Sequence, residues 1–351
     1  MAYDDLPIAT QTMFADLVER AWTGNLAGLT AGGGSAYTRE VKGRLYWYWR
    51  PATKFGARPS PLYIGPDTDQ TRDRINALTD QAASLRQRRD MVRALRAARL
   101  PVPDTMTGNV LAAMAEAGVF RLRAVVVGAV AFQSYAGLLG THLPASLSRT
   151  GDLDVAQFPA ISIAVEDQIE GDLEAVLRTV DSRFAGVPDA IDGRRTSRYA
   201  LRAGQDEIFA VDLLSPLRGP DRPRIGNLPA LRSDAQMLRY LDFLLYQEVN
   251  CVSLHGAGIP INIPDPTRFA LHKLIVSQLR RQDIQRSAAK ARKDIDQAGA
   301  LIGALARHRP DDLRDIWHEL CERGAGWQEK ASRSLALLPA DIHAAVTKPS
   351  S

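Results

Sequence analysis

The first third of the chain combines a helical hydrophobic period with a strand-like alternation. Residues 10–29 and 68–100 carry apolar side chains at helical spacing, and the second of these predicted helices is rich in arginine. Residues 41–50 instead alternate with a period of two, with valine, leucine and tryptophan on one face and lysine, arginine and tyrosine on the other. A loop is predicted at 51–61 and a returning strand at 62–65.

The rest of the chain alternates short strands with helices and then becomes mainly helical. Strands are predicted at 122–127, 153–155, 161–165, 197–202, 207–214 and, as a hairpin, 249–263. Helices are predicted at 130–139, 170–181, 233–246, 267–279, 287–307 and 310–321. Prolines cluster at 216–229 and indicate a linker. We therefore expect an N-terminal part (1–103), a core (104–220) and a mainly helical C-terminal part (228–345).

Composition agrees with an ordinary soluble globular protein of two or three domains. The 351 residues are 45% hydrophobic and 24% charged, with a net charge of +4, which excludes a histone-like polycation and an acidic disordered chain. Two cysteines, Cys251 and Cys321, exclude a disulfide framework and a cysteine-based zinc site. No apolar run reaches the length of a membrane span, and the first residues lack the features of a secretory signal. We expect a cytoplasmic protein without a membrane partner.

Three aspartates form the main candidate for chemistry. Asp152 and Asp154 are two residues apart, so on a strand both carboxylates project from one face. Asp212 lies in an apolar strand, where an ionised carboxylate needs a partner or a metal. If the two strands are neighbours, three carboxylates converge, which suits two Mg²⁺ ions. The structural alternative is that Asp152 caps a turn, Asp154 is solvated and Asp212 ends a strand.

A glycine precedes these aspartates at the junction of a strand and a helix. Gly128 and Ala129 follow a buried strand and begin the next helix. A glycine at such a junction lets backbone amides approach a phosphate, and the N-terminus of the helix favours the anion. By itself this arrangement is common in folds without a ligand. A strand–glycine–helix junction that is followed by Asp152, Asp154 and Asp212 in this order is a more specific indication of phosphate binding.

A series of motifs resembles the nucleotidyltransferase superfamily of the DNA polymerase β type, and more narrowly a bacterial nucleotidyltransferase family. The motifs are GRLYWY at 43–48, YIGPD at 63–67, VGAVAF at 127–132, TGDLD at 150–154, VDLLSP at 211–216, IPDPTRFALHK at 263–273 and KDIDQA at 293–298. The resemblance implies an α+β fold in which a mixed sheet flanked by helices forms the core. An N-terminal region of helix and β-hairpin would precede this core, and a mainly helical C-terminal domain would follow it.

The resemblance also implies roles for individual residues. Asp152 and Asp154 would bind two metal ions and the triphosphate, and Asp212 would complete the metal site near the attacking hydroxyl and help to deprotonate it. Gly128 would lie beside the β- and γ-phosphates. Ala129 departs from the family, which usually has Ser, Thr or Gly at this place, so the hydroxyl contact to phosphate is lost. The grip on phosphate would then pass to backbone amides and Lys273. Mg²⁺ is the expected ion, with Mn²⁺ as an alternative.

Two further cations are candidates for nucleotide binding. Residues 268–293 contain eight Lys and Arg against one Asp, and Arg268 and Lys293 are the candidates within this segment besides Lys273. The alternative is a solvated helix face. The segment around Lys293 also resembles abortive-infection nucleotidyltransferase toxins, in which a helix carrying Lys and Asp completes the active site.

The N-terminal part carries a basic and aromatic segment. Residues 37–99 contain 14 Lys and Arg against 6 Asp and Glu. Basic groups for phosphates with interleaved aromatic rings are typical of surfaces that bind RNA or single strands. The candidate nucleic-acid-binding residues share the polar face of 41–50, and they are Lys42, Arg44, Tyr46, Tyr48 and Arg50. The alternative is that the rings belong to the core and the arginines line a solvated helix.

Two hypotheses follow from the sequence. The first is an Mg²⁺-dependent enzyme that transfers an NMP from an NTP to an acceptor hydroxyl, with RNA or tRNA as the favoured acceptor; a toxin or defence role with an antitoxin partner is a variant of it. The second is a non-catalytic protein that binds nucleic acid or a partner through a decayed nucleotidyltransferase core. Ala129 favours the second hypothesis, and the retention of all three carboxylates favours the first.

Overall fold

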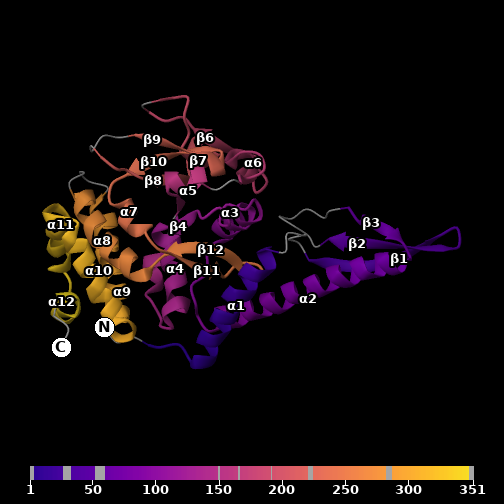
Figure 1. The fold of residues 1–351 in the computed structure, drawn as a ribbon, viewed down its shortest axis with the longest axis horizontal. Coiled ribbons are helices and arrows are strands. Elements are labelled where there is room, and N and C mark those ends of the chain that lie inside the picture. Colours follow the sequence, from indigo (N-terminus) through magenta and orange to yellow (C-terminus); the bar gives the residue numbers. More distant parts are fainter. Residues whose placement is uncertain are drawn as a thin grey trace.

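A computed structural model of the chain describes residues 4–26, 33–51, 60–148, 151–164, 167–190, 192–219, 224–281 and 287–347. Within these residues, nine strands form one mixed sheet with the order β11-β12-β4-β5-β8-β10-β9, and β7 joins β8 to β6 (Figure 1). The strands are β4 (Val125–Val127), β5 (Asp152–Ala156), β6 (Phe184–Val187), β7 (Arg198–Ala203), β8 (Asp206–Pro216), β9 (Ile225–Leu228), β10 (Ser233–Leu238), β11 (Glu248–Ser253) and β12 (Ile259–Pro264).

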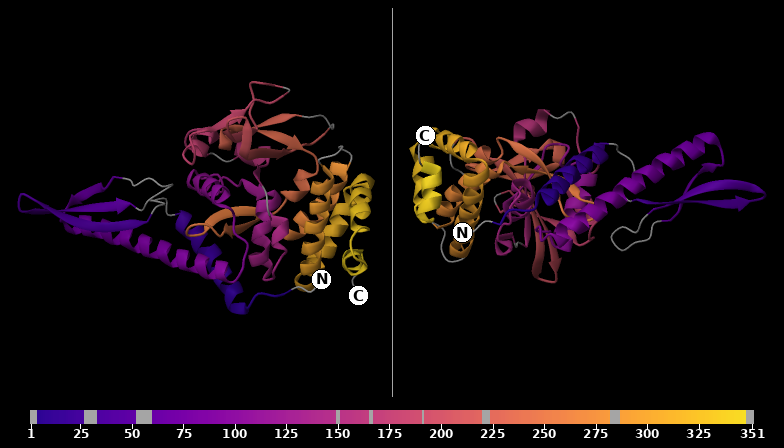
Figure 2. Two further views of the ribbon diagram at one scale, coloured as in Figure 1. Left: turned by 180° about the vertical axis from the view of Figure 1, so that it is seen from behind. Right: turned by 90° about the horizontal axis from the view of Figure 1, so that it is seen from below.

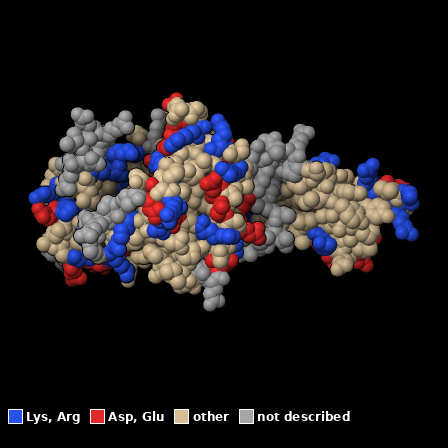
Figure 3. Space-filling view, turned by 90° about the horizontal axis from the view of Figure 1, so that it is seen from above, with Lys and Arg blue, Asp and Glu red and all other residues tan. Residues whose placement is uncertain are grey.

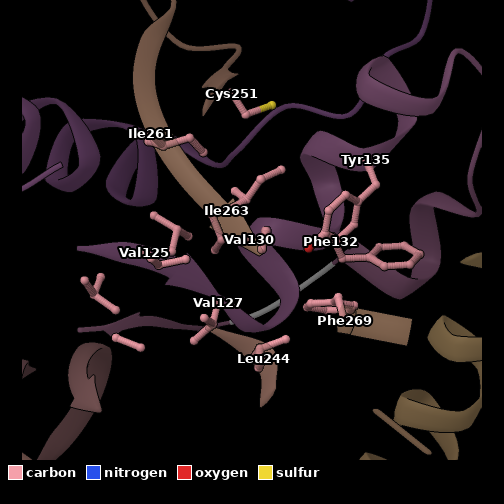
Figure 4. Packing of buried hydrophobic residues seen from close by; sticks show 14 of the residues in the cluster. Val125, Val127, Val130, Phe132, Tyr135, Leu244, Cys251, Ile261, Ile263 and Phe269 are labelled. Atoms are coloured by element: carbon pink, nitrogen blue, oxygen red, sulfur yellow. The ribbon is translucent and has the colours of Figure 1, made fainter. Parts of the chain in front are cut away.

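Parallel and antiparallel pairs alternate in the middle of this sheet. β12 runs parallel to β4, β4 antiparallel to β5, and β5 parallel to β8. Every residue of β4 and β12 is buried, and β5 and β8 are buried apart from their aspartates and the first three residues of β8. Figure 4 shows Val127, Ile263 and Phe269 within this core. The expected α+β class with a mixed sheet between helices is confirmed.

Helices cover the sheet and form the C-terminal region. α3 (Thr105–Glu116), which the sequence pattern did not predict, packs against β12, and α4 (Gly128–Leu139) packs against β4 and β5. The long helices α8 and α9 pack along each other beside the sheet, and α10, α11 and α12 complete the mainly helical end of the chain (Figure 1). The remaining helices are α5 (Pro159–Ala164), α6 (Leu173–Arg178), α7 (Leu241–Leu244), α8 (Pro266–Arg281), α9 (Ser287–His308), α10 (Pro310–Glu322), α11 (Ala325–Leu335) and α12 (Ala340–Thr347).

The N-terminal part forms an arm that projects from this body (Figures 1 and 2). It consists of a three-stranded antiparallel sheet laid on the long helix α2, with α1 at its base. The elements of the arm are α1 (Ile8–Leu26), β1 (Gly34–Val41), β2 (Arg44–Pro51), β3 (Leu62–Pro66) and α2 (Asp69–Ala97). Thr68 caps α2 through its side chain, so the helix begins at the residue where the sequence predicts it.

The arm is joined to the body through the C-terminal half of α2. The buried Arg88 donates from Nε to the carbonyl of Ala257 (2.9 Å) and from Nη2 to that of Gly258 (2.5 Å), both in the turn between β11 and β12. Burial lowers the pKa of Arg88 to about 10. Trp22 of α1 donates from Nε1 to the carbonyl of Cys251 on β11. The base of the arm is therefore attached through polar contacts as well as apolar packing.

Two short stretches differ from the secondary structure predicted for them. Residues 161–165, predicted as a strand, form in their described part the helix α5, which begins with a proline suited to a first helical turn. Residues 233–246, predicted as one helix, form β10 and the short α7. β10 pairs with β8 and β9, and such long-range pairing overrides a local helical period.

Other boundaries also differ. Residues 41–50 are not one strand, because Lys42 (φ 52°) and Gly43 (φ 75°) form the turn between β1 and β2. β4 is shorter than the predicted strand at 122–127, and β9 lies within the predicted linker at 216–229. The loop predicted at 51–61 falls mostly outside the described residues.

The main sheet takes strands from both sides of the predicted boundary at 220–228. β4 to β8 come from the part predicted as the core, whereas β10, β11 and β12 come from the part predicted as mainly helical. The division into three domains stays a prediction. Among the described residues, no helix is both long and apolar enough to cross a membrane.

Candidate active site

Two neighbouring strands of the main sheet carry the three candidate aspartates. β5 and β8 run in parallel, and their register places Asp154 directly opposite Asp212 and Asp152 opposite Ala210. Since alternate residues of a strand share a face, all three carboxylates project from the same face of the sheet. Leu153 between the two aspartates of β5 is fully buried on the other face. The period-two spacing thus places these aspartates together.

The pKa of Asp154 is raised by its surroundings. The pKa of Asp154 is raised to about 6, first by burial and then by the charges of Asp152 and Asp212, while Lys273 and Arg280 oppose the rise. A raised pKa means that the protonated carboxyl is favoured, so added positive charge at this place would be favourable. The negative charge is therefore only partly compensated by the side chains around it.

Asp212 has a cationic partner that the sequence analysis did not identify. Arg198 on the adjacent strand β7 donates from Nη1 to Oδ2 of Asp212 at 2.5 Å, and from Nη2 to Oε1 of Glu207 at 2.5 Å. Burial raises the pKa of Asp212, and the hydrogen bond from Arg198 opposes that rise. The turn of the hairpin would by itself pair Arg198 with Val211, and an irregularity in the pairing between Leu201 and Arg202 shifts the register so that Arg198 lies opposite Asp212. The hairpin pattern in the sequence therefore gave no signal for this contact.

Gly128 lies at the end of β4, next to Asp154. Its φ is 69°, and a Cβ at this position would lie 2.5 Å from Oδ2 of Asp154. Both the left-handed backbone and the close approach of the carboxylate therefore require glycine. The helix α4 starts here, so its first backbone amides point out beside the aspartates. Ala129 follows as a half-buried residue without a hydroxyl.

A cleft of about 420 Å³ opens beside these residues. Gly128, Asp154, Arg198 and Asp212 line it from the sheet, and α8 contributes His272, Lys273 and Arg280. Much of the remaining lining is apolar and comes from β8, β10, α7 and α8, namely Leu214, Leu238, Leu241, Leu244, Phe269 and Val276. The volume is in the range of small-molecule sites, and apolar side chains beside charged ones suit a ligand with a flat ring and an anionic group.

Buried ion pairs between α8 and α9 hold the basic wall of the cleft in place. Lys273 donates from Nζ to Oδ1 of Asp294 at 2.6 Å, and Arg280 places Nε 2.8 Å from Oδ2 of the same carboxylate. Asp294 is only 3% exposed. Lys293, the neighbour of Asp294, is half-buried, and burial followed by the charge of Lys273 lowers its pKa. Lys293 also interacts electrostatically with Asp152, but it does not line the cleft.

Arg268 does not line the cleft. Its guanidinium pairs with Glu319 of α10 at 3.0 and 2.5 Å, and it lies over the rings of Phe243 and Tyr246. This pair lowers the pKa of Glu319. Arg268 therefore fastens α8 to α10. Sequence position could not distinguish this role from nucleotide binding, because the partner lies 51 residues away.

Two polar residues of α8 that were not selected from the sequence, Arg280 and His272, also line the cleft. Arg280 follows Lys273 by seven residues, two helical turns, so the same helix face carries both, and this spacing could have indicated it. His272 is 7% exposed, its Nε2 has no hydrogen-bond partner, and burial followed by the nearby cations lowers its pKa to about 3. The imidazole is therefore neutral.

The basic and aromatic residues of the arm lie apart from the cleft. Arg44, Tyr46, Tyr48 and Arg50 belong to β2, and Lys42 lies in the turn before it. The arm projects from the side of the body on which neither α7 nor α8 lies (Figures 1 and 2). These residues therefore form a separate surface.

The chemistry of the carboxylates of Asp152, Asp154 and Asp212 suits a hard divalent cation. Carboxylate oxygens are the ligands that Mg²⁺ and Mn²⁺ prefer, and the raised pKa of Asp154 shows that added positive charge would be favourable. In the described parts of the chain, no three His, Cys, Asp or Glu side chains are grouped so that they could hold an ion as they stand. Arg198 is the side chain with which an ion would compete for Asp212.

Facing aspartates on adjacent strands of a mixed sheet, next to a glycine that begins a helix, form an arrangement in which carboxylates and backbone amides are available to a phosphate and its metal ions. The comparison with protein families agrees. The family model described as Nucleotidyltransferase matches residues 105–322, and the chain belongs to this family. No curated protein and no solved structure matches the chain. The match spans α3 to α10 and leaves the arm outside.

Proposed function

We propose that this nucleotidyltransferase moves an NMP from an NTP to an acceptor hydroxyl and releases pyrophosphate. The observation that carries the proposal is the register of β5 and β8, which sets Asp154 opposite Asp212 beside the glycine that begins α4. Carboxylates next to helix amides, with cations on the facing wall, form the charge pattern that a triphosphate and its metal ions require.

The residues of the cleft would divide the work of this reaction. Backbone amides at the start of α4, with Lys273 and Arg280 of α8, would bind the triphosphate. Asp212 would accept the proton of the attacking hydroxyl. The new bond joins the acceptor oxygen to the α-phosphorus, the bond from that phosphorus to the bridging oxygen breaks, and pyrophosphate leaves.

Mg²⁺, or Mn²⁺ in its place, would be held by Asp152, Asp154 and Asp212. It would supply charge neutralisation at the phosphates and lower the pKa of the hydroxyl. The apolar lining residues Leu241 and Leu244, together with the neutral His272, would suit the base of the nucleotide.

A labelled-nucleotide assay tests this proposal. Each α-labelled NTP is incubated with Mg²⁺, total cellular RNA and the protein, and label is sought in the RNA, protein and small-molecule fractions. The proposal expects label in one fraction with wild type, and none with Asp152→Ala/Asp154→Ala. Label in the RNA fraction would support the RNA acceptor that we propose. Equal labelling by both proteins would contradict the assignment of the site.

The competing function is that of a binding protein with an inactive core. Two observations favour it: Ala129 offers no hydroxyl to a phosphate, and Arg198 occupies an oxygen of Asp212. The same assay separates the two functions. RNA binding that ignores Mg²⁺ and NTP, without a labelled product in any fraction, would favour the competing function.

A toxic activity is an extension of the proposed transfer. Its support is the sequence resemblance around Lys293, together with the position of this lysine near Asp152. Expression of the wild type should arrest growth, and expression of Asp154→Asn to the same level should not. Arrest by both proteins would show that transfer is not its cause.

A further inference from the structure

The outward face of the arm is a continuous surface of tyrosine rings and arginines. Residues directly opposite each other in an antiparallel pair share a face. The register of β1 and β2 places Tyr37 opposite Tyr48 and Arg39 opposite Tyr46, and Tyr63 of β3 lies opposite Tyr48. The same face carries Ser35 and Val41 from β1, and Arg44 and Arg50 from β2.

The rings of this face lie close enough to form one platform. Tyr37 stacks on Tyr48 with centroids 5.6 Å apart and ring planes 20° apart. Tyr63 meets Tyr48 edge-on at 5.5 Å and Tyr46 at 6.1 Å. Arg50 lies 4.9 Å from the centroid of Tyr37. The four rings therefore form a connected strip across all three strands.

The opposite face of the same sheet explains why these rings point outward. It carries Trp49, which is 2% exposed, and Trp47, whose Nε1 donates to Oδ1 of Asp67 at 2.8 Å. This is the face that lies on α2. The tryptophans already supply the packing that holds the sheet on its helix. The tyrosines are not needed for that purpose, and Tyr63 leaves 56% of its surface exposed.

The charge of the outward face has one sign. Arg39, Arg44 and Arg50 are exposed on it, and Lys42 lies at its tip. Among the described residues of the three strands, the only acidic side chain is Glu40, which the register assigns to the other face. Figure 3 shows the arm as a broad uncharged surface with charged side chains, most of them basic, at its tip and edges.

We infer that this platform, formed by Tyr37, Tyr46, Tyr48 and Tyr63 with Arg39, Arg44 and Arg50, binds single-stranded nucleic acid. Bases stack on aromatic rings regardless of sequence, and arginines between the rings meet the phosphates that connect the bases. A duplex keeps its base faces stacked internally and cannot offer them to the rings. A protein partner would need apolar or acidic complementarity, and a row of arginines favours phosphate over an uncharged partner.

This inference rests on the proposed function only in that the bound strand would be the polymer whose end accepts the nucleotide. Binding itself requires neither NTP nor turnover, so it is tested without them. Strand binding that persists in a catalytically dead protein would support the platform whether or not transfer occurs. Transfer to a small molecule without strand binding would overturn the platform and leave the cleft assignment intact.

Fluorescence anisotropy tests the inference on the full chain. The probe is a labelled single-stranded RNA of about 12 nucleotides without fixed structure, the scale of known single-strand sites. A DNA strand of the same sequence and an RNA duplex serve as comparisons. We expect both single strands to bind, the duplex to bind at least about ten times more weakly, and the affinity to fall steeply as salt increases. A tighter RNA complex than DNA complex would identify RNA as the ligand.

Variants of the platform sharpen the test. Tyr63→Ala should weaken binding at least about fivefold, and Tyr63→Phe, which keeps the ring, should not. Arg39→Ala/Arg44→Ala should reduce the dependence of log affinity on log salt by about two. Neither change removes a side chain that packs on α2, so the arm stays folded.

Tyr246→Ala, an exposed tyrosine on the body, and Asp154→Asn in the cleft are the matched controls and should bind like wild type. Absence of binding at low salt, duplex binding as tight as that of the single strand, or unchanged affinity in both Tyr63→Ala and Arg39→Ala/Arg44→Ala would overturn the inference.

Discussion

The cleft and the arm use the same kinds of charged residue in opposite ways. In the cleft, Asp154 lies near two other carboxylates whose charge is opposed by Lys273 and Arg280. Behind the cleft lining, Asp294 is buried and pairs with the same two cations. On the outward face of the arm, Arg39 and Arg44 are exposed, and the described residues of the three strands place no carboxylate on that face. The cleft is organised by interactions inside the protein, whereas the arm presents groups that are available to a ligand.

This difference indicates a division of labour. A site that positions reacting groups needs side chains fixed by burial and pairing, because small displacements lower the rate strongly. A surface that holds a flexible polymer needs exposed rings and charges, and it tolerates the loss of any single one. Changes in the cleft should therefore affect turnover or folding, and changes on the arm should affect affinity.

The largest expected effect is on turnover. Asp212→Asn removes the carboxylate that faces Asp154 but keeps its size, and Arg198 keeps an oxygen to bind. We expect nucleotidyl transfer to fall by a factor on the order of 10³, while the anisotropy titration with single-stranded RNA is unchanged. Asp206→Asn, an exposed carboxyl at the start of the same strand, is the control. Transfer above a tenth of wild type would contradict the role of Asp212.

The next effect is on stability. Asp294→Ala leaves Lys273 and Arg280 without their buried partner, which should lower the free energy of unfolding by about 3–5 kcal/mol in urea titrations. Asp296→Ala removes an exposed ion pair with Arg292 on the same helix and should cost less than about 0.5 kcal/mol. Equal losses in the two variants would show that burial of the Asp294 pair has no special importance.

The raised pKa of Asp154 predicts a dependence of stability on pH. In the folded protein this group titrates near pH 6, against an ordinary value of 3.8. The folded state therefore binds more protons than the unfolded state between these values, so stability falls as pH rises from about 4 to 6. The loss should approach roughly 2–3 kcal/mol and then level off. Asp154→Asn should lack this component, and a parallel pH profile in the two proteins would contradict it.

The smallest effect on stability concerns the glycine that begins α4. Gly128→Ala introduces a Cβ 2.5 Å from Oδ2 of Asp154 at a positive φ, whereas Gly204→Ala has a similar φ of 65° in a turn with open space around it. Each should lose about 1–2 kcal/mol of stability from the backbone conformation. Only Gly128→Ala should also reduce transfer, by about a hundredfold, since it displaces a carboxylate. Full transfer in Gly128→Ala would show that this carboxylate position is not critical.

The parts of the fold that the sequence predicted are those determined locally. Asp152 and Asp154 alternate on one strand, the hairpin of β7 and β8 follows from its turn, and α2, α8, α9 and α10 follow from long helical periods with Thr68, Pro266 and Pro310 at or near their starts. From the sequence, the three aspartates were expected to converge only if β5 and β8 are neighbours. The sequence did not show whether these strands pair.

What the sequence did not predict depends on contacts between distant segments. β10 looks helical alone and is a strand because β8 and β9 flank it. Arg268 and Lys273 are equally basic in the sequence, but the partner of one is Glu319 and that of the other is Asp294. The period of two did place Tyr46 and Tyr48 on the face opposite the tryptophans, but the helix on which the tryptophan face lies, α2, is set by contacts between separate elements.

The most direct test of the account measures transfer and strand binding on the same preparations of wild type, Asp154→Asn and Tyr63→Ala. Pyrophosphate release and incorporation of α-label are followed with Mg²⁺, NTP and RNA, and anisotropy is followed without NTP. The account predicts equimolar pyrophosphate and label with wild type, neither with Asp154→Asn despite normal strand binding, and weaker binding with preserved transfer at high RNA concentration for Tyr63→Ala. Transfer by Asp154→Asn at the wild-type rate would contradict the central claim that the facing carboxylates of β5 and β8 form the active site.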